Sequence, residues 1–331
     1  MTITAKIIAD SVQQGPNMRV LGSTSRAFPA GYHSRLTTFV LKYPRFIHAE
    51  FMTHRAFSRN ASSSRAIPVK TMIQKVIDDP AMPVHWGKNQ AGMQAHDELS
   101  NEFVEYEKET FGGVVKSLSS PRQEAKNQWL KARDEAIVHV NKLMGLGLHK
   151  QIANRILEPW MHIEVVCTAT DFANFYALRN HPDAQPEIQA LANAMLDAHS
   201  ASKPIVLRPG QWHLPFVDPA EYSDAANGGL LTLHSDVYRD LARRSAARCA
   251  RVSYLKHDGT AASFEEDLSL YERLMGGNPK HASPTEHQAK APESPEELAA
   301  YPSNLKGWVQ FRKLHEGETV KFYSSSRWSG A

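Results

Sequence analysis

Stretches of continuous or alternating apolar residues predict four short β-strands in this chain. These strands cover residues 3–9, 36–43, 160–168 and 205–207. Apolar residues with helical spacing predict helices in the longer stretches between them. The predicted helices are residues 46–52, 68–78, 95–111, 122–143, 149–157, 171–179, 187–199, 235–250 and 264–275. Because short strands lie between long helical stretches, the pattern favours a helix-rich α+β fold.

Clusters of proline and glycine predict loops at residues 79–92, 208–229 and 276–303. None of these clusters marks a clean boundary, so we predict a single domain over residues 1–331. Within it, residues 290–303 (KAPESPEELAAYPS) have the composition of an exposed connector. Trp308 and Phe311 are predicted to anchor a C-terminal helix to the rest of the domain.

Composition narrows the class of protein without identifying it. The chain has 331 residues, a formal net charge of +3 and two cysteines, Cys167 and Cys249, which form no Cys-x-x-Cys pair. So small a charge argues against a dedicated duplex-binding protein, and the two separate cysteines indicate a reducing compartment. No apolar stretch is long enough to span a membrane, and the start of the chain lacks the features of a signal peptide. We therefore expect a cytoplasmic protein that binds neither nucleic acid nor membrane.

The most unusual local pattern is residues 53–65 (THRAFSRNASSSR), which we call the polar segment. It contains one histidine, three arginines, one asparagine and four serines, but only three apolar residues. So polar a run argues against a buried strand or a core helix and predicts a loop held between ordered elements, where sites are usually built. Its guanidinium and hydroxyl donors suit a phosphate group or a flavin. The alternative is a solvated basic loop.

Three stretches of the chain resemble the flavin-dependent thymidylate synthases. The polar segment has Thr53-His54-Arg55, seven residues and then Ser63, where the family has Arg-His-Arg, seven residues and serine. Residues 147–159 are similar to the family's Ala-Arg-x-x-Leu-Pro helix end, with one residue inserted. Residues 174–188 resemble its Asn/His-Phe-x-x-Leu-Arg…Ala-Gln-x-Glu-Ile segment. The polar segment departs from the family at Thr53, Ala61 and Ala66, where arginine, glutamate and tyrosine are usual.

A further stretch resembles the family but lies out of order. Residues 250–254 (ARVSY), an acidic helix over residues 263–275, and residues 281–287 (HASPTEH) match the family's opening segment, which usually precedes the polar segment. The resemblance therefore implies a circularly permuted order, which is tolerable because domain termini often lie close together. It also implies that residues 281–287 lie beside the polar segment, supplied by the same chain or by a neighbouring subunit.

The resemblance implies a fold with a small, mostly antiparallel sheet and a specific activity. The expected reaction is methylation of dUMP to dTMP, with FAD as cofactor, methylenetetrahydrofolate as one-carbon donor and NADPH as reductant. In such a reaction the protein positions the reactants and stabilises charge, while the cofactor carries the chemistry. The expected assembly is a homotetramer with sites shared between subunits.

Roles follow for individual residues from the same resemblance. Ser63, Ser64, Arg65 and Arg155 would bind the nucleotide, chiefly its phosphate. Arg179 would be the catalytic residue, stabilising negative charge on the pyrimidine ring, and Glu50, where the family has glutamine, would lie near the base. The residues expected to hold the flavin are His54, Arg55, Asn174, His281 and Ser283.

Other interpretations stay open. No metal is expected, because His281, Glu286 and His287 have poor spacing for zinc and no cysteine joins them. The arginines at 243, 244, 248 and 251 predict a solvated helix face rather than a nucleic-acid patch. The departures at Glu50, Thr53 and Ala61 also suit a related enzyme that methylates or hydroxymethylates dUMP or dCMP. A non-catalytic nucleotide-binding protein on the same fold is the alternative from another class.

Overall fold

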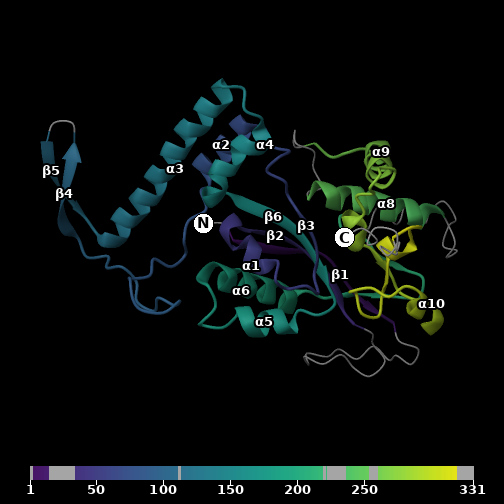
Figure 1. Ribbon diagram of the computed structural model, residues 1–331. Helices are drawn as coiled ribbons and strands as arrows, with labels where there is room; N and C mark the ends of the chain where they lie inside the picture. Colours follow the sequence, from purple (N-terminus) through teal and green to yellow (C-terminus); the bar gives the residue numbers. More distant parts are fainter. Residues whose placement is uncertain are drawn as a thin grey trace, which may run out of the picture.

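A five-stranded sheet runs through the middle of the protein (Figure 1). The computed structural model describes residues 3–14, 34–110, 113–218, 221, 236–252 and 260–318. The strand order is β3-β6-β2-β1-β7, and all neighbours are antiparallel except β1 and β7. Its strands are β1 (Thr4–Gln13), β2 (Leu36–Pro44), β3 (Ser58–Ala61), β6 (His162–Ala169) and β7 (Ile205–Leu207). The prediction of an α+β fold with a small, mostly antiparallel sheet is confirmed.

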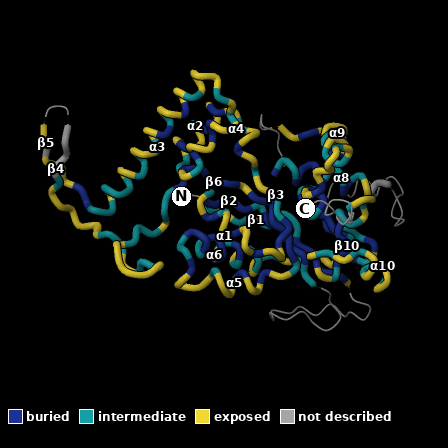
Figure 2. Tube along the Cα trace, viewed as in Figure 1, coloured by how far each residue is buried: buried dark blue, intermediate teal, exposed yellow. Residues whose placement is uncertain are grey.

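One face of the sheet is covered by three helices that follow the strands closely in sequence. Side chains alternate across a strand, and on this face Phe39, Leu41 and Ile163 enter the main apolar core. Figure 2 colours much of the central sheet as buried, with the helices that cover this face below it. The helices are α1 (His48–Phe51), α5 (Ala173–Arg179) and α6 (Pro186–Ala201). The prediction of helices at residues 171–179 and 187–199 is therefore confirmed to within a few residues.

A second helical group packs at one end of the sheet. Its core includes Val76, Val140, Leu157 and Trp160. The helix predicted at residues 149–157 is instead one short turn followed by a 3₁₀ helix that contains Pro159, because proline lacks the N–H that an α-helix requires. The group consists of α2 (Val69–Asp78), α3 (Pro121–Gly145), α4 (Lys150–Ala153) and the 3₁₀ helix η2 (Asn154–Trp160).

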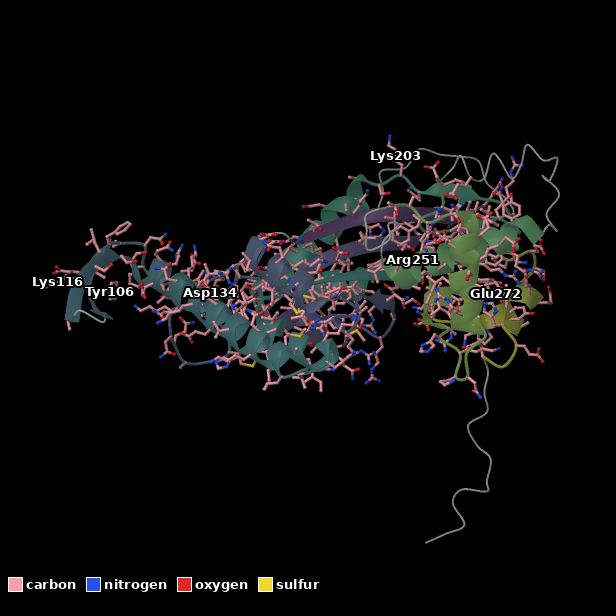
Figure 3. All side chains as sticks on the ribbon, turned by 90° about the horizontal axis from the view of Figure 1, so that it is seen from above. Tyr106, Lys116, Asp134, Lys203, Arg251 and Glu272 are labelled. Carbon is pink, nitrogen blue, oxygen red and sulfur yellow. The ribbon has the colours of Figure 1, made fainter. Side chains whose placement is uncertain are left out.

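The helix predicted at residues 95–111 is wrong. Residues 104–110 form β4 (Val104–Thr110), which pairs antiparallel with β5 (Gly113–Ser119). The sequence carries a signal for this hairpin, because a glycine pair at 112–113 is typical of tight connections between strands. Figure 3 shows Tyr106 and Lys116 of this hairpin at one end of the molecule, beyond Asp134 of α3, while Glu272 lies towards the other end.

The C-terminal part covers the opposite face of the sheet. Val40 and Val166 of the sheet contact Cys249 and Val252. This part contains α8 (Asp236–Arg251), α9 (Phe264–Met275), α10 (Pro295–Ala300), and the 3₁₀ helices η3 (Ser283–Glu286) and η4 (Phe311–Leu314). Three two-residue strands form a second sheet, β8 (Trp212–His213), β9 (Ala289–Lys290) and β10 (Val309–Gln310). Short elements thus occupy the two predicted loops at residues 208–229 and 276–303, although residues 219–220 and 222–229 lie outside the described part.

The expected exposed connector and the C-terminal anchor both lie in this part. Residues 290–303 include the end of β9, helix α10, none of whose residues is buried, and Ala291, which is buried and does not fit an exposed connector. Trp308 is fully buried and Phe311 nearly so, but the helix at Phe311 is a short 3₁₀ turn. A single domain over residues 1–331 stays a prediction.

The prediction of a solvated arginine face on α8 is wrong. Arg248 is only 1% exposed, and its Nε donates to the carboxylate of Asp267 at 3.0 Å. Arg244 donates to the same fully buried carboxylate at 3.1 Å, and Arg251 also pairs with it. Asp267 lies on α9, so the sequence around α8 does not show that these arginines have a buried carboxylate partner.

Four pairwise contacts link five polar side chains in a buried row between the sheet and the C-terminal part. Ser11 contacts Nδ1 of His213 at 2.9 Å, and Nε2 of His213 contacts Thr38 at 2.8 Å. Thr38 contacts Thr168 at 2.7 Å, and Thr168 contacts Nδ1 of His287 at 2.8 Å. Burial lowers the pKa of both histidines to about 3, because a charged imidazolium loses its hydration there.

The two buried histidines, His213 and His287, predict a loss of stability in mild acid. The unfolded chain binds protons near the ordinary histidine pKa of 6.5 while the folded protein does not. Stability is therefore complete above pH 6.5 and falls as the pH decreases towards the folded pKa. Each histidine should remove about 1 kcal/mol from the free energy of unfolding over the first pH unit below 6.5. Urea unfolding at several pH values measures this slope.

A double variant checks the assignment of that slope. Replacing His213 and His287 with glutamine should reduce the pH dependence between pH 6.5 and 5.5 by about 2 kcal/mol, even if the variant is less stable at pH 7.5. Part of the slope should remain, because the pKa values of His54 and His199 are also lowered, to about 4. The exposed His96 provides the control, because His96→Gln should leave the slope unchanged. An unchanged slope in the double variant would contradict the prediction.

Candidate functional site

Part of the polar segment is an edge strand of the sheet with buried residues. The prediction that so polar a run cannot form a buried strand is therefore wrong. Residues 58–61 are strand β3, which pairs with β6, and Ser58 and Asn60 are 1% and 9% exposed. Buried polar groups are tolerated when they are hydrogen-bonded. Ser58 Oγ accepts from Asn304 at 3.0 Å and from Gln310 at 3.3 Å, and the Asn60 amide donates to the Cys249 carbonyl at 3.4 Å.

Four residues from the stretches that resemble the family lie together near the N-terminal end of β3. Arg179, the last residue of α5, forms an ion pair through Nη1 with the carboxylate of Glu50 on α1. Its Nε donates to Nε2 of His54 at 3.0 Å, and its Nη2 donates to Thr53 Oγ1 at 3.5 Å. We call Glu50, Thr53, His54 and Arg179 the Arg179 cluster. The structure therefore brings the predicted catalytic arginine against two residues that the sequence had placed in the site.

His54 is the buried member of this cluster, and its protonation state follows from its contacts. Burial, and then the charges of Arg179 and Arg59, lower the pKa of His54 to about 4. A guanidinium group can only donate, so Nε2 of His54 must accept. The ring is therefore neutral at physiological pH and carries its proton on Nδ1. It packs edge-on against Phe175, with 4.9 Å between the ring centroids.

The predicted phosphate-binding residues lie at the other end of β3. Buried Asn154 shapes the turn at residues 63–66, because its amide donates to the carbonyls of Ser64 and Ile67 at 2.8 and 3.0 Å. Ser63 and Arg65 are exposed, and within the described part of the chain no other side chain pairs with theirs. Arg155 follows Asn154, with 60% of its side chain exposed and a single ion-pair contact, to Glu158 at 3.9 Å. We call Ser63, Ser64, Arg65 and Arg155 the cationic turn.

The Arg179 cluster and the cationic turn stay apart within one chain. They are separated by the four residues of β3, a strand length of about 13 Å. Across the described ranges no hydrogen bond or ion pair joins a residue of one group to a residue of the other. One chain therefore presents the predicted substrate residues as two separate groups.

The residues predicted to hold a flavin are all at the surface except His54. Arg55, Asn174, His281 and Ser283 are exposed. The 3₁₀ helix η3, which begins at Ser283, packs against β3 within the same chain. Gln310 connects the two, since its amide contacts Ser58 on β3 and the Glu286 carbonyl on η3. The expectation that this out-of-order stretch lies beside the polar segment is confirmed at the level of these two elements, although residues 253–254 lie outside the described part.

Sequence reasoning missed the residues that support the site from a distance. Asn154, Asn304 and Gln310 fix the backbone or side chains of the polar segment. Only Asn154 had a local signal, because it lies within the stretch that resembles the family's helix end. A cavity of about 270 Å³ behind Ser62 and Ser64 was also missed, since its lining comes from several separate segments, including Lys42, Arg45, Trp160 and His162.

Neither a metal-binding cluster nor a helix that could span a membrane is found among the described residues. Among the residues that the structure describes, no three histidine, cysteine, aspartate or glutamate side chains gather in a way that could hold a metal ion. In the same ranges, no helix combines the length and the hydrophobicity needed to cross a bilayer.

Comparison with known proteins identifies the family. Residues 33–205 match the Thy1 family, described as thymidylate synthase complementing protein. These residues include the polar segment, Arg155 and Arg179, and they make up more than half of the chain. The chain belongs to this family, which comprises the flavin-dependent thymidylate synthases.

The solved structures that are similar to this chain include one of a nucleotide methylase. It is a UMP/dUMP methylase, PolB, from Streptomyces cacaoi, bound with 5-Br dUMP. The two are 20% identical, and the likeness covers 50% of this chain and 67% of that chain, with a TM-score of 0.36. No curated protein matches the sequence of this chain.

Proposed function

We propose that this protein methylates dUMP to dTMP, with methylenetetrahydrofolate as one-carbon donor and NADPH as reductant. The observation that carries the proposal is the family match over residues 33–205, because it contains both the Arg179 cluster and the cationic turn. Bound FAD would supply the hydride that completes the methyl group. The protein's own residues would bind, orient and stabilise charge.

The cationic turn would hold the nucleotide phosphate. Arg65 and Ser63 present a guanidinium group and a hydroxyl group with no side-chain partner in the described residues. Arg155 adds a second cation, whose ion-pair contact among the described residues is a long one to Glu158. Planar guanidinium groups bind phosphate through two parallel hydrogen bonds, so this donor set suits a dianionic phosphate monoester.

Arg179 would act on the base. Negative charge that develops on the pyrimidine ring is best stabilised by a donor that is already oriented before the reaction. Contacts with Glu50, His54 and Thr53 orient the guanidinium group of Arg179 in advance. Arg179 is therefore our candidate catalytic residue, and Glu50 our candidate for contact with the base.

The residues present also fit a flavin dinucleotide. Arg55 and Asn174 offer exposed donors with no side-chain partner in the described residues. Ser283 is exposed at the start of η3, which packs against β3, and His281 is exposed two residues before it. The pyrophosphate of FAD needs donors of this kind. We propose that Arg55, Asn174, His281 and Ser283 hold the flavin, together with Nδ1–H of His54, which no described residue accepts.

We propose a homotetramer in which two subunits complete each site. The separation of the Arg179 cluster from the cationic turn by β3 supports this arrangement, since one nucleotide must contact both groups. A second copy could place its cationic turn opposite the Arg179 cluster of the first, as symmetric assemblies allow. The cytoplasm is the compartment that we propose for the assembly.

A spectroscopic assay tests the proposed function. The purified protein, supplied with FAD, should retain flavin absorbance after gel filtration and should oxidise NADPH faster when dUMP and methylenetetrahydrofolate are both present. Retained dUMP binding without flavin would instead favour a non-catalytic nucleotide-binding protein. Absence of both flavin and dUMP binding would contradict the proposal.

A second candidate substrate is suggested by one observation. The carboxylate of Glu50 lies against Arg179, and a carboxylate can only accept hydrogen bonds. It therefore suits the exocyclic amino group of a cytosine base as well as the N3–H group of uracil. A related enzyme that methylates or hydroxymethylates dCMP would show faster turnover with dCMP than with dUMP.

Arg65→Ala should weaken dUMP binding by roughly tenfold to a hundredfold, because a charge-assisted contact with phosphate contributes about 1.5–3 kcal/mol. Flavin content should stay near that of the unchanged protein. Isothermal calorimetry with dUMP measures the affinity, and Lys70→Ala, which removes another exposed cation from α2, is the matched control. Unchanged affinity in Arg65→Ala would remove this residue from the site.

A further inference from the structure

Three residues accept hydrogen bonds from Arg179, and they constrain its guanidinium group to different degrees. Glu50 is a partly exposed residue of α1. Thr53 is exposed, and its Oγ1 lies at a long distance of 3.5 Å from Nη2 of Arg179. His54 is buried and accepts from Nε at 3.0 Å. The contact with Nε is also the one nearest the aliphatic part of the arginine side chain, so it restricts rotation of the whole planar group.

The His54 ring is itself held in place by aromatic side chains. Phe57 stacks on it, with ring centroids 5.8 Å apart and an angle of 24° between the planes. Phe175 meets it edge-on at 4.9 Å. Phe175 and Arg179 lie four residues apart on α5, so they are neighbours on one face of that helix. A single imidazole ring therefore contacts both an apolar side chain and the guanidinium group on the same face.

We propose that His54 is a positioning residue for Arg179, and that the lone pair on Nε2 holds the guanidinium plane in the orientation required at the pyrimidine ring. This inference rests on the proposed function for its consequence in nucleotide binding. The contact itself requires only that His54 is neutral with its proton on Nδ1, since Arg179 has no lone pair to offer. The remaining N–H groups of Arg179 are then left to face a ligand.

A pair of variants separates this role from simple packing. His54→Gln keeps an acceptor near the position of Nε2, whereas His54→Asn reaches only as far as Nδ1. We expect His54→Asn to weaken dUMP binding roughly tenfold or more, the effect of one charge-assisted hydrogen bond. His54→Gln should stay within about threefold of the unchanged protein. His48→Asn is the control, because His48 contacts Tyr43 and not Arg179.

The tautomer of His54 provides a measurement that does not depend on activity. NMR of the ring nitrogens in isotopically labelled protein at neutral pH should show a neutral ring with its proton on Nδ1. In Arg179→Leu the Nε2 signal should shift, because its donor is lost. A proton on Nε2, or signals unchanged in Arg179→Leu, would overturn the inference whatever the protein catalyses.

The two measurements distinguish the failure of this inference from the failure of the proposed function. Equal dUMP affinity in His54→Asn and the unchanged protein would overturn the positioning role while leaving the function intact. If the unchanged protein binds no pyrimidine nucleotide, the proposed function fails. In that case the NMR result alone decides whether His54 positions Arg179.

Discussion

Arg179→Ala should lower kcat for dUMP at least a hundredfold. A donor aimed at charge that develops in the transition state contributes roughly a hundredfold to a thousandfold to the rate. The variant also removes the partner of Glu50 and of His54, so the Arg179 cluster loses its only cation. Flavin content should be close to normal, because our proposed flavin contacts come from other residues. Steady-state kinetics with saturating dUMP measure the effect.

Two further variants make this result specific. Arg179→Lys keeps the charge but loses the planar fork, so it should recover only part of the activity. Arg122→Ala removes an arginine that forms an ion pair with Glu98 and that contacts no residue of the Arg179 cluster in the described part of the chain, and it should leave kcat unchanged. Normal turnover in Arg179→Ala would show that the chemistry takes place elsewhere.

Asp267→Ala should lower the free energy of unfolding by about 3–5 kcal/mol, the usual cost of removing one partner from a buried ion pair. The variant leaves three arginines facing an empty position, and Arg248 among them is almost fully buried. Among the described residues, Arg248 also pairs with the carboxylate of Glu221, at 2.8 Å. Urea unfolding monitored by circular dichroism at neutral pH measures the difference.

Asp240→Ala is the matched control for Asp267→Ala. Asp240 forms a partly exposed pair with Arg243, one turn along the same helix, at 3.1 Å. Such pairs contribute less than about 1 kcal/mol. A loss in Asp267→Ala no larger than in Asp240→Ala would mean that the arginines of α8 find other partners or water.

The parts of the fold that could be predicted are those whose signals are local. Strand β2 and helix α9 follow directly from apolar patterning, and their bounds differ from the prediction by no more than one residue. Ser263 begins α9 by accepting a hydrogen bond from the backbone of Glu266 at 3.2 Å, which is a sequence-readable cap. Residues 104–110 form a strand although their run of charged residues is compatible with a helix, and the local signal for the hairpin is the glycine pair that follows.

The misassigned polar residues have distant partners. Ser58 needs Asn304 and Gln310, and the arginines of α8 need Asp267. A local pattern classes such residues as solvated because it contains only their own polarity, not the groups that satisfy them. Burial of Ser58 therefore depends on the packing of the C-terminal part against β3, and burial of Arg248 depends on the packing of α9 against α8.

The candidate site was predictable in composition but not in arrangement. The motifs indicated Glu50, His54 and Arg179, and the structure brings these three together. The same motifs implied that Arg65 and Arg155 lie with them, yet β3 separates the two groups within one chain. The spacing of residues in the sequence identifies the motifs. It does not show that β3 carries the cationic turn away from the Arg179 cluster.

The most direct test of the central claim is to identify the nucleotide product. Purified protein would be incubated with FAD, NADPH and methylenetetrahydrofolate carrying an isotopically labelled one-carbon unit, with dUMP and dCMP in parallel reactions. Mass spectrometry should find dTMP that carries the label in the dUMP reaction, formed at least a hundredfold more slowly in a reaction with Arg179→Ala protein. An unlabelled product, a labelled hydroxymethyl nucleotide, or label only in the dCMP reaction would contradict the assignment as a dUMP methylase.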